Sequence, residues 1–112
     1  MIEMIVCNYL ESKLNIKARP EKPLSDSECI FVEKTAGEES DYITSATVAI
    51  QSYGSSMYKA ADLNKKVKVA MRDIVELDNV SAVRYVTDYN FTDTETKRYR
   101  YQAVYTVTYY ED

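Results

Sequence analysis

The most regular alternation of hydrophobic and polar positions lies in the last third of the chain. Residues 99–110 divide into two sets at a spacing of two, and this period, with many aromatic and β-branched side chains, predicts a β-strand. One set is Tyr99, Tyr101, Ala103, Tyr105, Val107 and Tyr109, and the other is Arg100, Gln102, Val104, Thr106, Thr108 and Tyr110. The first set is apolar and has to be covered, whereas the second can face water or another protein.

Two segments repeat their hydrophobic positions with the period of an α-helix. Between residues 2 and 15 these positions are Ile2, Ile5, Val6, Tyr9 and Leu10, and between residues 57 and 76 they are Ala60, Leu63, Val67, Ala70, Met71 and Ile74. Each spacing puts apolar side chains on one face of a helix. We therefore expect two amphipathic helices, the second capped by Ser55 or Ser56.

The remaining segments predict strands and loops. Residues 29–34, 43–53 and 80–87 are expected to form strands, and residues 15–21 an extended edge around Pro20. Residues 35–41, with three acids and a glycine, and residues 87–98 are expected to form loops. This order predicts a single α+β domain over residues 1–112, with an antiparallel or mixed β-sheet of about four to five strands and both helices packed on one face.

The composition argues against catalysis and against nucleic-acid binding. Histidine is absent, which removes the commonest general base and the commonest metal ligand. Cys7 and Cys29 have no adjacent cationic residue and are expected to be buried, reduced thiols. The acids of residues 88–95 lack the glycine of a calcium-binding loop, and the net charge of −4 disfavours binding to phosphates. We expect no enzyme activity, no catalytic residue, no metal and no cofactor.

Membrane attachment is not expected either. The apolar runs are too short to span a bilayer, and residues 1–4 lack the basic and apolar regions of a secretory signal. We therefore expect a cytoplasmic protein without a membrane partner.

The remaining signal is a binding surface. The chain has 11 tyrosines against 2 phenylalanines and no tryptophan, and tyrosine suits half-covered surfaces and subunit interfaces. Tyr89 and Phe91 lie among polar residues, so Phe91 either folds back onto the core or inserts into a partner. Acids at 38–41 and bases at 97, 98 and 100 form opposite patches, which permit a head-to-tail association that closes into a ring.

Several segments, taken in order, resemble a known family. They are Tyr9-Leu10, the proline-containing stretch 17–23, Val32-Glu33-Lys34-Thr35, Val48–Tyr53, Tyr89–Asp93 and Arg98–Ala103. In this order the chain resembles the small tail terminator proteins, also called tail completion or minor capsid proteins, of long-tailed bacteriophages and prophages. The resemblance covers essentially the whole chain, and residues 32–35 and 100–103 are its more specific parts. Neither part is a catalytic signature.

The resemblance implies a non-enzymatic structural protein of virion assembly. In that family a hexameric ring caps the tail tube, stops its polymerisation and provides the surface that docks to the head. The implied partners are further copies of the chain, the tail-tube protein and the head-tail connector protein. DNA would only pass through the lumen without specific binding, because acidic walls repel phosphates. The implied location is the host bacterial cytoplasm during assembly and then the tail-head junction of the virion.

The matched segments, together with the glycine-containing acidic loop and the basic patch at residues 97–100, also supply candidate interface residues. They are Glu33, Lys34, Glu38, Glu39, Asp41, Tyr89, Asn90, Phe91, Asp93, Lys97, Arg98, Arg100 and Gln102. Two alternatives stay open at this point. The chain could be a head completion protein of the neck, or a small regulatory protein that binds one partner through residues 89–91.

Overall fold

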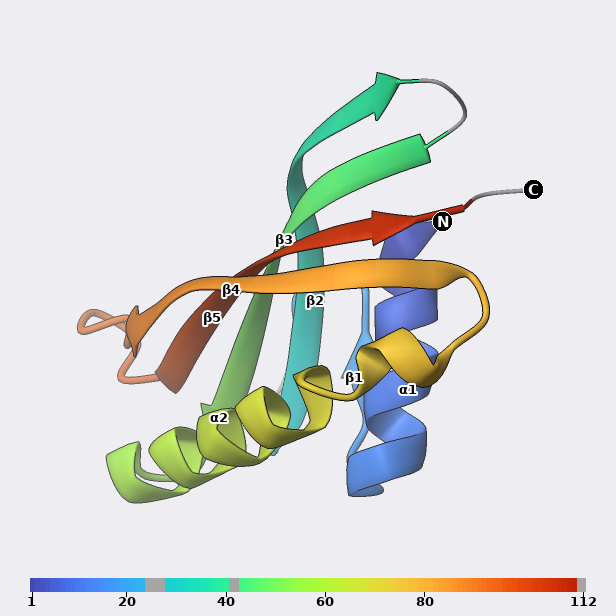
Figure 1. Cartoon of the computed structure of the whole chain (residues 1–112). Coiled ribbons are helices and arrows are strands. Elements are labelled where there is room, and N and C mark those ends of the chain that lie inside the picture. The colour runs from blue at the N-terminus through green and yellow to red at the C-terminus, as the bar shows by residue number, and fades with distance from the viewer. Residues whose placement is uncertain (24–27, 41–42, 111–112) are drawn as a thin grey trace.

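The computed structural model describes residues 1–23, 28–40 and 43–110, and of residues 38–40 it describes the backbone alone. The elements are α1 (Ile2–Leu14), β1 (Ala18–Arg19), β2 (Cys29–Ser40), β3 (Ile43–Gly54), α2 (Met57–Met71), a 3₁₀ turn (Ile74–Glu76), β4 (Val80–Asn90) and β5 (Tyr99–Tyr109). The strands form one sheet in the order β1-β2-β3-β5-β4, in which β1 and β2 are parallel and all other neighbours antiparallel. Both helices pack against this mixed sheet, which confirms the predicted α+β class (Figure 1).

Local signals in the sequence set the ends of both helices. Asn15 adopts the left-handed conformation (φ 55°) and its N–H donates to the carbonyl of Glu11 at 2.9 Å, which ends α1. The Oγ of Ser56 accepts the N–H of Lys59 at 3.2 Å and caps α2. The predicted serine cap is therefore confirmed at Ser56.

One hydrophobic core fills the space between the helices and the sheet. The apolar positions predicted for both helices are in it, with the exception of the partly buried Ile5 and of Ala60, which is buried outside this cluster. The strand β5 contributes Ala103, Tyr105, Val107 and Tyr109, and the Tyr9 hydroxyl donates to the carbonyl of Ala70 at 2.7 Å, which joins α1 to α2. Burial of these side chains supplies the main stabilisation, at about 1.5–3 kcal/mol for each large apolar side chain.

The prediction of a loop at residues 35–41 is wrong over its described part. Strand β2 continues to Ser40 and pairs with β3 as far as Ile43, with one irregularity between Lys34 and Ala36. Pairing with β3 overrides the turn-like local composition. The distal halves of the two strands, Thr35–Ser40 and Ile43–Thr47, extend beyond the helices, and we call them the hairpin arm (Figure 1).

Two further boundaries differ from the prediction. Helix α2 ends at Met71 and not at Glu76, because the chain tightens into the 3₁₀ turn, which still buries Ile74 and so keeps the hydrophobic spacing. Strand β4 extends to Asn90, where it pairs with Tyr101, so the predicted loop 87–98 is shorter than expected.

Candidate interaction surface

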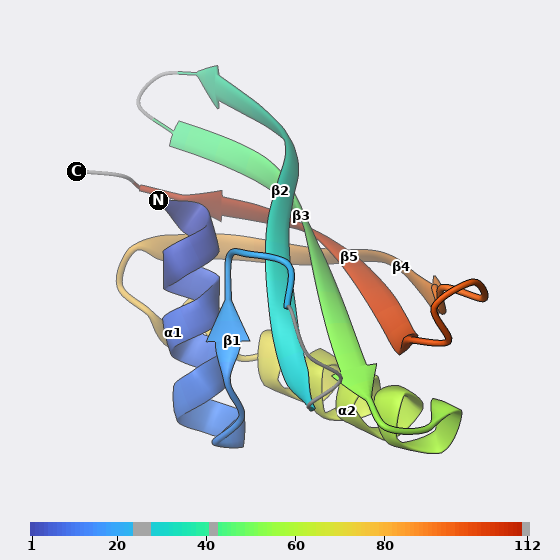
Figure 2. The same ribbon diagram turned by 180° about the vertical axis from the view of Figure 1, so that it is seen from behind.

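Strands β3, β5 and β4 lie side by side in the sheet (Figure 2), and polar side chains of the three strands are aligned. The strand register places Tyr53 beside Arg100, and it places Gln51 beside Gln102. On the other side of β5, Gln102 lies beside Tyr89. Three neighbouring strands, β3, β5 and β4, therefore bring together side chains that are up to 51 residues apart in the chain.

Hydrogen bonds join four of these side chains into a row that we call the glutamine ladder: Tyr53, Gln51, Gln102 and Tyr89. The Tyr53 hydroxyl donates to Gln51 Oε1 at 2.8 Å, and Gln51 Nε2 donates to Gln102 Oε1 at 3.0 Å. Gln102 Nε2 in turn donates to the Tyr89 hydroxyl at 2.5 Å. Both glutamines are buried although no helix covers this face. The ladder satisfies amide groups that would otherwise be expensive to bury.

Arginines close one end of this row. Arg100 Nε donates to the carbonyl of Phe91 at 2.6 Å and its Nη1 to the Tyr53 hydroxyl at 3.1 Å, while the guanidinium lies 4.5 Å from the centre of the Phe91 ring. The guanidinium of Arg98 lies 4.8 Å from the centre of the Tyr53 ring. We call Tyr53, Tyr89, Phe91, Arg98 and Arg100 the aromatic–arginine cluster.

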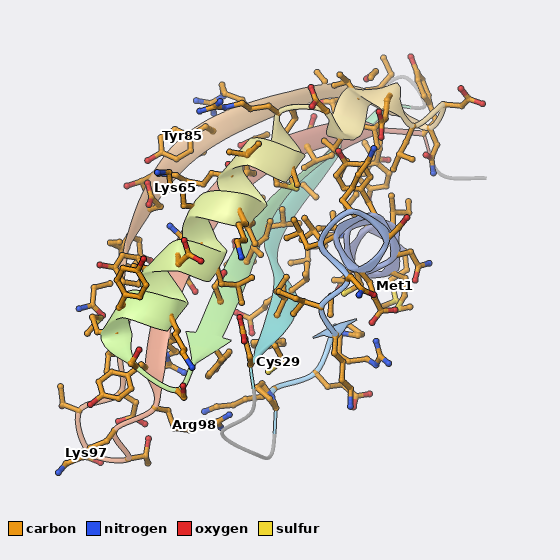
Figure 3. The ribbon with its side chains drawn as sticks, turned by 90° about the horizontal axis from the view of Figure 1, so that it is seen from below. Met1, Cys29, Lys65, Tyr85, Lys97 and Arg98 are labelled. Carbon is orange, nitrogen blue, oxygen red and sulfur yellow. The ribbon has the colours of Figure 1, made fainter. Side chains whose placement is uncertain are left out.

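The cluster is fixed from a second direction by the segment that leads into β2. Arg98 Nη1 donates to the carbonyl of Pro23 at 2.8 Å. Figure 3 shows Arg98 pointing towards this segment and Lys97 pointing away from the body at the tip of the loop. The two arginine side chains are therefore held in place before any partner binds, which lowers the entropy lost on binding.

Phe91 does not plug the end of the core. Its side chain is 39% exposed, it meets the Tyr89 ring edge-on at 5.8 Å between centroids, and Tyr89 is itself 41% exposed. Of the two interpretations of this loop, the structure therefore contradicts the one in which Phe91 folds back onto the core.

Three other candidates of the same loop have structural roles instead. The Oδ1 of Asn90 accepts the N–H of Thr92 at 2.9 Å, and the Oδ1 of Asp93 accepts the N–H of Glu95 at 3.0 Å. Lys97 adopts a positive φ of 57° at the end of the turn. These contacts shape the turn between β4 and β5, and they place its aromatic residues next to Arg100.

The candidates on β2 lie apart from the cluster. Glu33 pairs with Ala49 and Lys34 with Val48, so their side chains leave the sheet on opposite faces, and both are exposed. The backbones of Glu38 and Glu39 belong to the hairpin arm. Asp41 lies outside the described residues. The structure thus brings together Tyr89, Phe91, Arg98, Arg100 and Gln102, and it separates the acidic candidates from them.

An ion pair between α2 and β4 was not predicted from the sequence. Asp88 accepts hydrogen bonds from Asn64 Nδ2 at 2.8 Å, from Lys68 Nζ at 3.2 Å and from the Tyr85 hydroxyl. Burial alone raises the pKa of Asp88, but these hydrogen bonds outweigh it and hold that pKa below its usual value. Asp88 was expected in a loop, and only the fold shows that it meets Lys68.

A groove runs beside this ion pair, between α2 and β4. It holds about 600 Å³ and is lined by Lys68, Met71, Arg72, Val83, Tyr85 and Tyr105. Burial raises the pKa of Tyr105 to about 12, so its hydroxyl stays protonated at neutral pH. The groove is therefore lined by the cationic side chains of Lys68 and Arg72 and by the neutral hydroxyl of Tyr105.

The cysteines are buried, as expected. Burial raises the pKa of Cys7 to about 11 and also raises the pKa of Cys29, which keeps both thiols protonated at neutral pH. Among the residues that the structure describes, acidic and cysteine side chains form no group of three that could hold a metal ion. In the same part of the chain no helix has the length and hydrophobicity needed to cross a bilayer.

Comparison with known proteins does not add to this geometry. No protein-family model matches the chain, and no curated protein matches it in sequence.

Two residues of the surface, Gln51 and Tyr53, were not among the candidates predicted from the sequence. The alternation of residues 43–53 places both on one face of a strand. Their partners, however, depend on the pairing of β3 with β5, and a single sequence does not give this pairing.

Proposed function

We propose that this chain is a non-enzymatic structural protein of a long-tailed bacteriophage or prophage, a tail terminator that forms a ring on the tail tube. The ring stops polymerisation of the tube and provides the surface to which the head docks. It works in the host cytoplasm during assembly and remains at the tail-head junction of the virion. The proposal rests on the resemblance of the sequence and on the kind of surface that the fold presents.

The observation that carries the proposal is the aromatic–arginine cluster on the helix-free face. Tyrosine and arginine are enriched among the residues that dominate protein–protein binding energies. Here Arg100 is held by Phe91 and Tyr53 while two aromatic rings stay partly exposed. A preorganised set of this kind on a sheet face suits contact with another protein better than it suits the enclosure of a small substrate.

The distribution of charge supports the same function. The net charge of −4 opposes tight binding to DNA, so a ring built from this chain would let DNA pass without holding it. The partners that we propose are other copies of the chain, the tail-tube protein and the head-tail connector protein.

Mixing the chain with polymerising tail-tube protein tests the proposal. We expect tubes of limited length with a ring at one end in negative-stain electron microscopy. Arg100→Glu should fold, as circular dichroism would show, yet cap several-fold fewer tubes, because the carboxylate loses the contacts with Phe91 and Tyr53. Lys65→Glu makes the same charge change on exposed α2 and should cap like the unmodified chain.

Two results would overturn the proposal. One is an unmodified chain that neither associates nor changes the length of the tubes. The other is capture of portal or adaptor proteins of the neck with no binding to tail-tube protein, which would favour a head completion protein.

A further inference from the structure

The sheet ends in two strand edges that pair with no other described strand. On one side β4 is the last strand over its whole length, Val80–Asn90. On the other side β1 pairs only with Ile30 and Phe31, so β2 from Val32 to Ser40 has no outer neighbour among the described residues. Each edge presents a row of backbone N–H and C=O groups that another strand can bind.

The edge at β4 is poorly protected against such pairing. Monomeric proteins usually place lysine or proline on an edge strand, and the segment Val80–Asn90 contains neither. It exposes large side chains instead, with Tyr85 50% and Val86 44% exposed. Its protective devices are the exposed charge of Arg84 and a pair of irregularities near Ser81 and Val86. The irregularities leave Ala82–Tyr85 and Thr87–Asn90 in regular register.

The two edges have the right directions to pair with each other. β2 and β5 are both antiparallel to β3 and therefore run the same way. β4 is antiparallel to β5 and so runs opposite to β2. In a sheet that continues from one copy to the next, β4 of one copy would therefore lie antiparallel to β2 of its neighbour. Antiparallel pairing is the more stable kind.

The charges of the two edges also match. On β4 the exposed charge is Arg84, because Asp88 is already neutralised by Lys68. The segment Val32–Ser40 contains three acidic residues and one lysine, and Glu33 in it is exposed. Opposite charge on two edges favours their encounter and disfavours the pairing of an edge with itself.

We propose that copies of this chain associate head to tail by pairing the β4 edge of one copy with the Val32–Ser40 edge of the next. The inference rests on the proposed function, since it names the subunit contact of the proposed ring. The contact uses two different surfaces, so it repeats from copy to copy and closes when the rotation allows. The free stretch of β2 spans roughly 30 Å at about 3.3 Å per residue, long enough to pair with the regular stretches of β4.

Cross-linking between two variants of the full chain, each with one added cysteine beside the native Cys7 and Cys29, tests the inference. Ala82→Cys places a thiol on β4 and Ala36→Cys places one on β2, both at exposed positions. With a short bis-maleimide we expect a covalent dimer in the mixture of the two variants and little in either alone. The double variant should give a ladder of higher species. The native thiols are buried and protonated, and Asn8→Cys on exposed α1 is the matched control that should not cross-link with either edge.

A charge exchange gives a second readout. Arg84→Glu and Glu33→Arg should each reduce association several-fold in sedimentation, and together they should restore it, with unchanged circular dichroism throughout. A dimer of Ala82→Cys with itself would mean two-fold pairing of β4 edges and would overturn the inference. So would the absence of any cross-link in the mixture. If tubes are capped while the edges fail to cross-link, the edge contact alone is wrong. If edges cross-link and no tube is capped, the inference stands and the tail terminator function is wrong.

Discussion

Replacing Gln51 and Gln102 by methionine, singly and together, tests whether the glutamine ladder stabilises the fold as a unit. Methionine keeps the unbranched shape and nearly the volume of glutamine but removes the donor and the acceptor. Both glutamines are buried, so water replaces the lost hydrogen bonds poorly. A buried polar group that loses its partner costs about 1–3 kcal/mol.

The expected magnitudes follow from the partners that each substitution leaves behind. Gln51→Met removes the acceptor of the Tyr53 hydroxyl, which keeps Arg100 as its donor, and the donor to Gln102 Oε1. We therefore expect a loss of about 2 kcal/mol. Gln102→Met leaves Gln51 Nε2 without an acceptor, whereas the partly exposed Tyr89 hydroxyl turns to water, so we expect about 1.5 kcal/mol. The double variant contains neither glutamine, so no amide group is left without its partner. We expect a loss of about 2 kcal/mol in total, hence a coupling of about 1.5 kcal/mol between the two sites.

Urea unfolding followed by circular dichroism measures these differences, provided that the slope of free energy against urea stays constant across the four proteins. Thr106→Val is the control on the same face, where we expect a change within about 0.5 kcal/mol. Additivity of the two methionine substitutions within about 0.5 kcal/mol would refute the ladder as a coupled unit.

Two further predictions concern the packing of α2. A Cβ on Gly54 would lie 2.5 Å from the backbone nitrogen of Ala60, so Gly54→Ala should lower the free energy of unfolding by about 1–3 kcal/mol. In Gly37→Ala the nearest atom is the flexible Lys34 Cε at 2.8 Å, and a change within about 0.5 kcal/mol is expected in the same urea assay; equal effects would contradict this packing. The lowered pKa of Asp88 contributes stability above the unfolded-state pKa of about 4, and this is lost as the pH falls through the folded-state value. Asp88→Asn should therefore be less stable at pH 7, and its deficit should shrink on acidification, whereas a deficit independent of pH would show that the charge of Asp88 contributes nothing.

The sequence was informative wherever a single element decides the outcome. The alternation along residues 99–110 correctly separated Ala103, Tyr105 and Val107, which the helices cover, from the opposite face. The helical repeats likewise identified core residues of both helices, because the burial of a helix face depends mainly on its own period.

The sequence was least informative wherever two distant strands decide the outcome together. Gln102 falls on the polar side of β5 and was expected to meet water or a partner, yet it is buried. Its burial is tolerated because Gln51 on β3 donates a hydrogen bond to its amide. In the same way, residues 35–40 read as a loop until β3 pairs with them. Strand register is a property of the pair, and alternation in one strand does not specify it.

The same pairing explains why the helix-free face is suited to contact with protein. A face that carries free amides and hydroxyls loses their hydration when it docks, and this loss opposes binding. On this sheet the polar groups are already hydrogen-bonded to one another and not to water, in the side chains of Gln51, Gln102 and Tyr53. Docking against them therefore removes little hydration. Arg100 is also already ordered, by the Phe91 carbonyl and the Tyr53 hydroxyl. The free energy gained by covering Tyr89 and Phe91 is therefore offset by a smaller desolvation cost than on an ordinary polar sheet face. A variant that disrupts the ladder should consequently weaken association by more than its effect on folding alone accounts for.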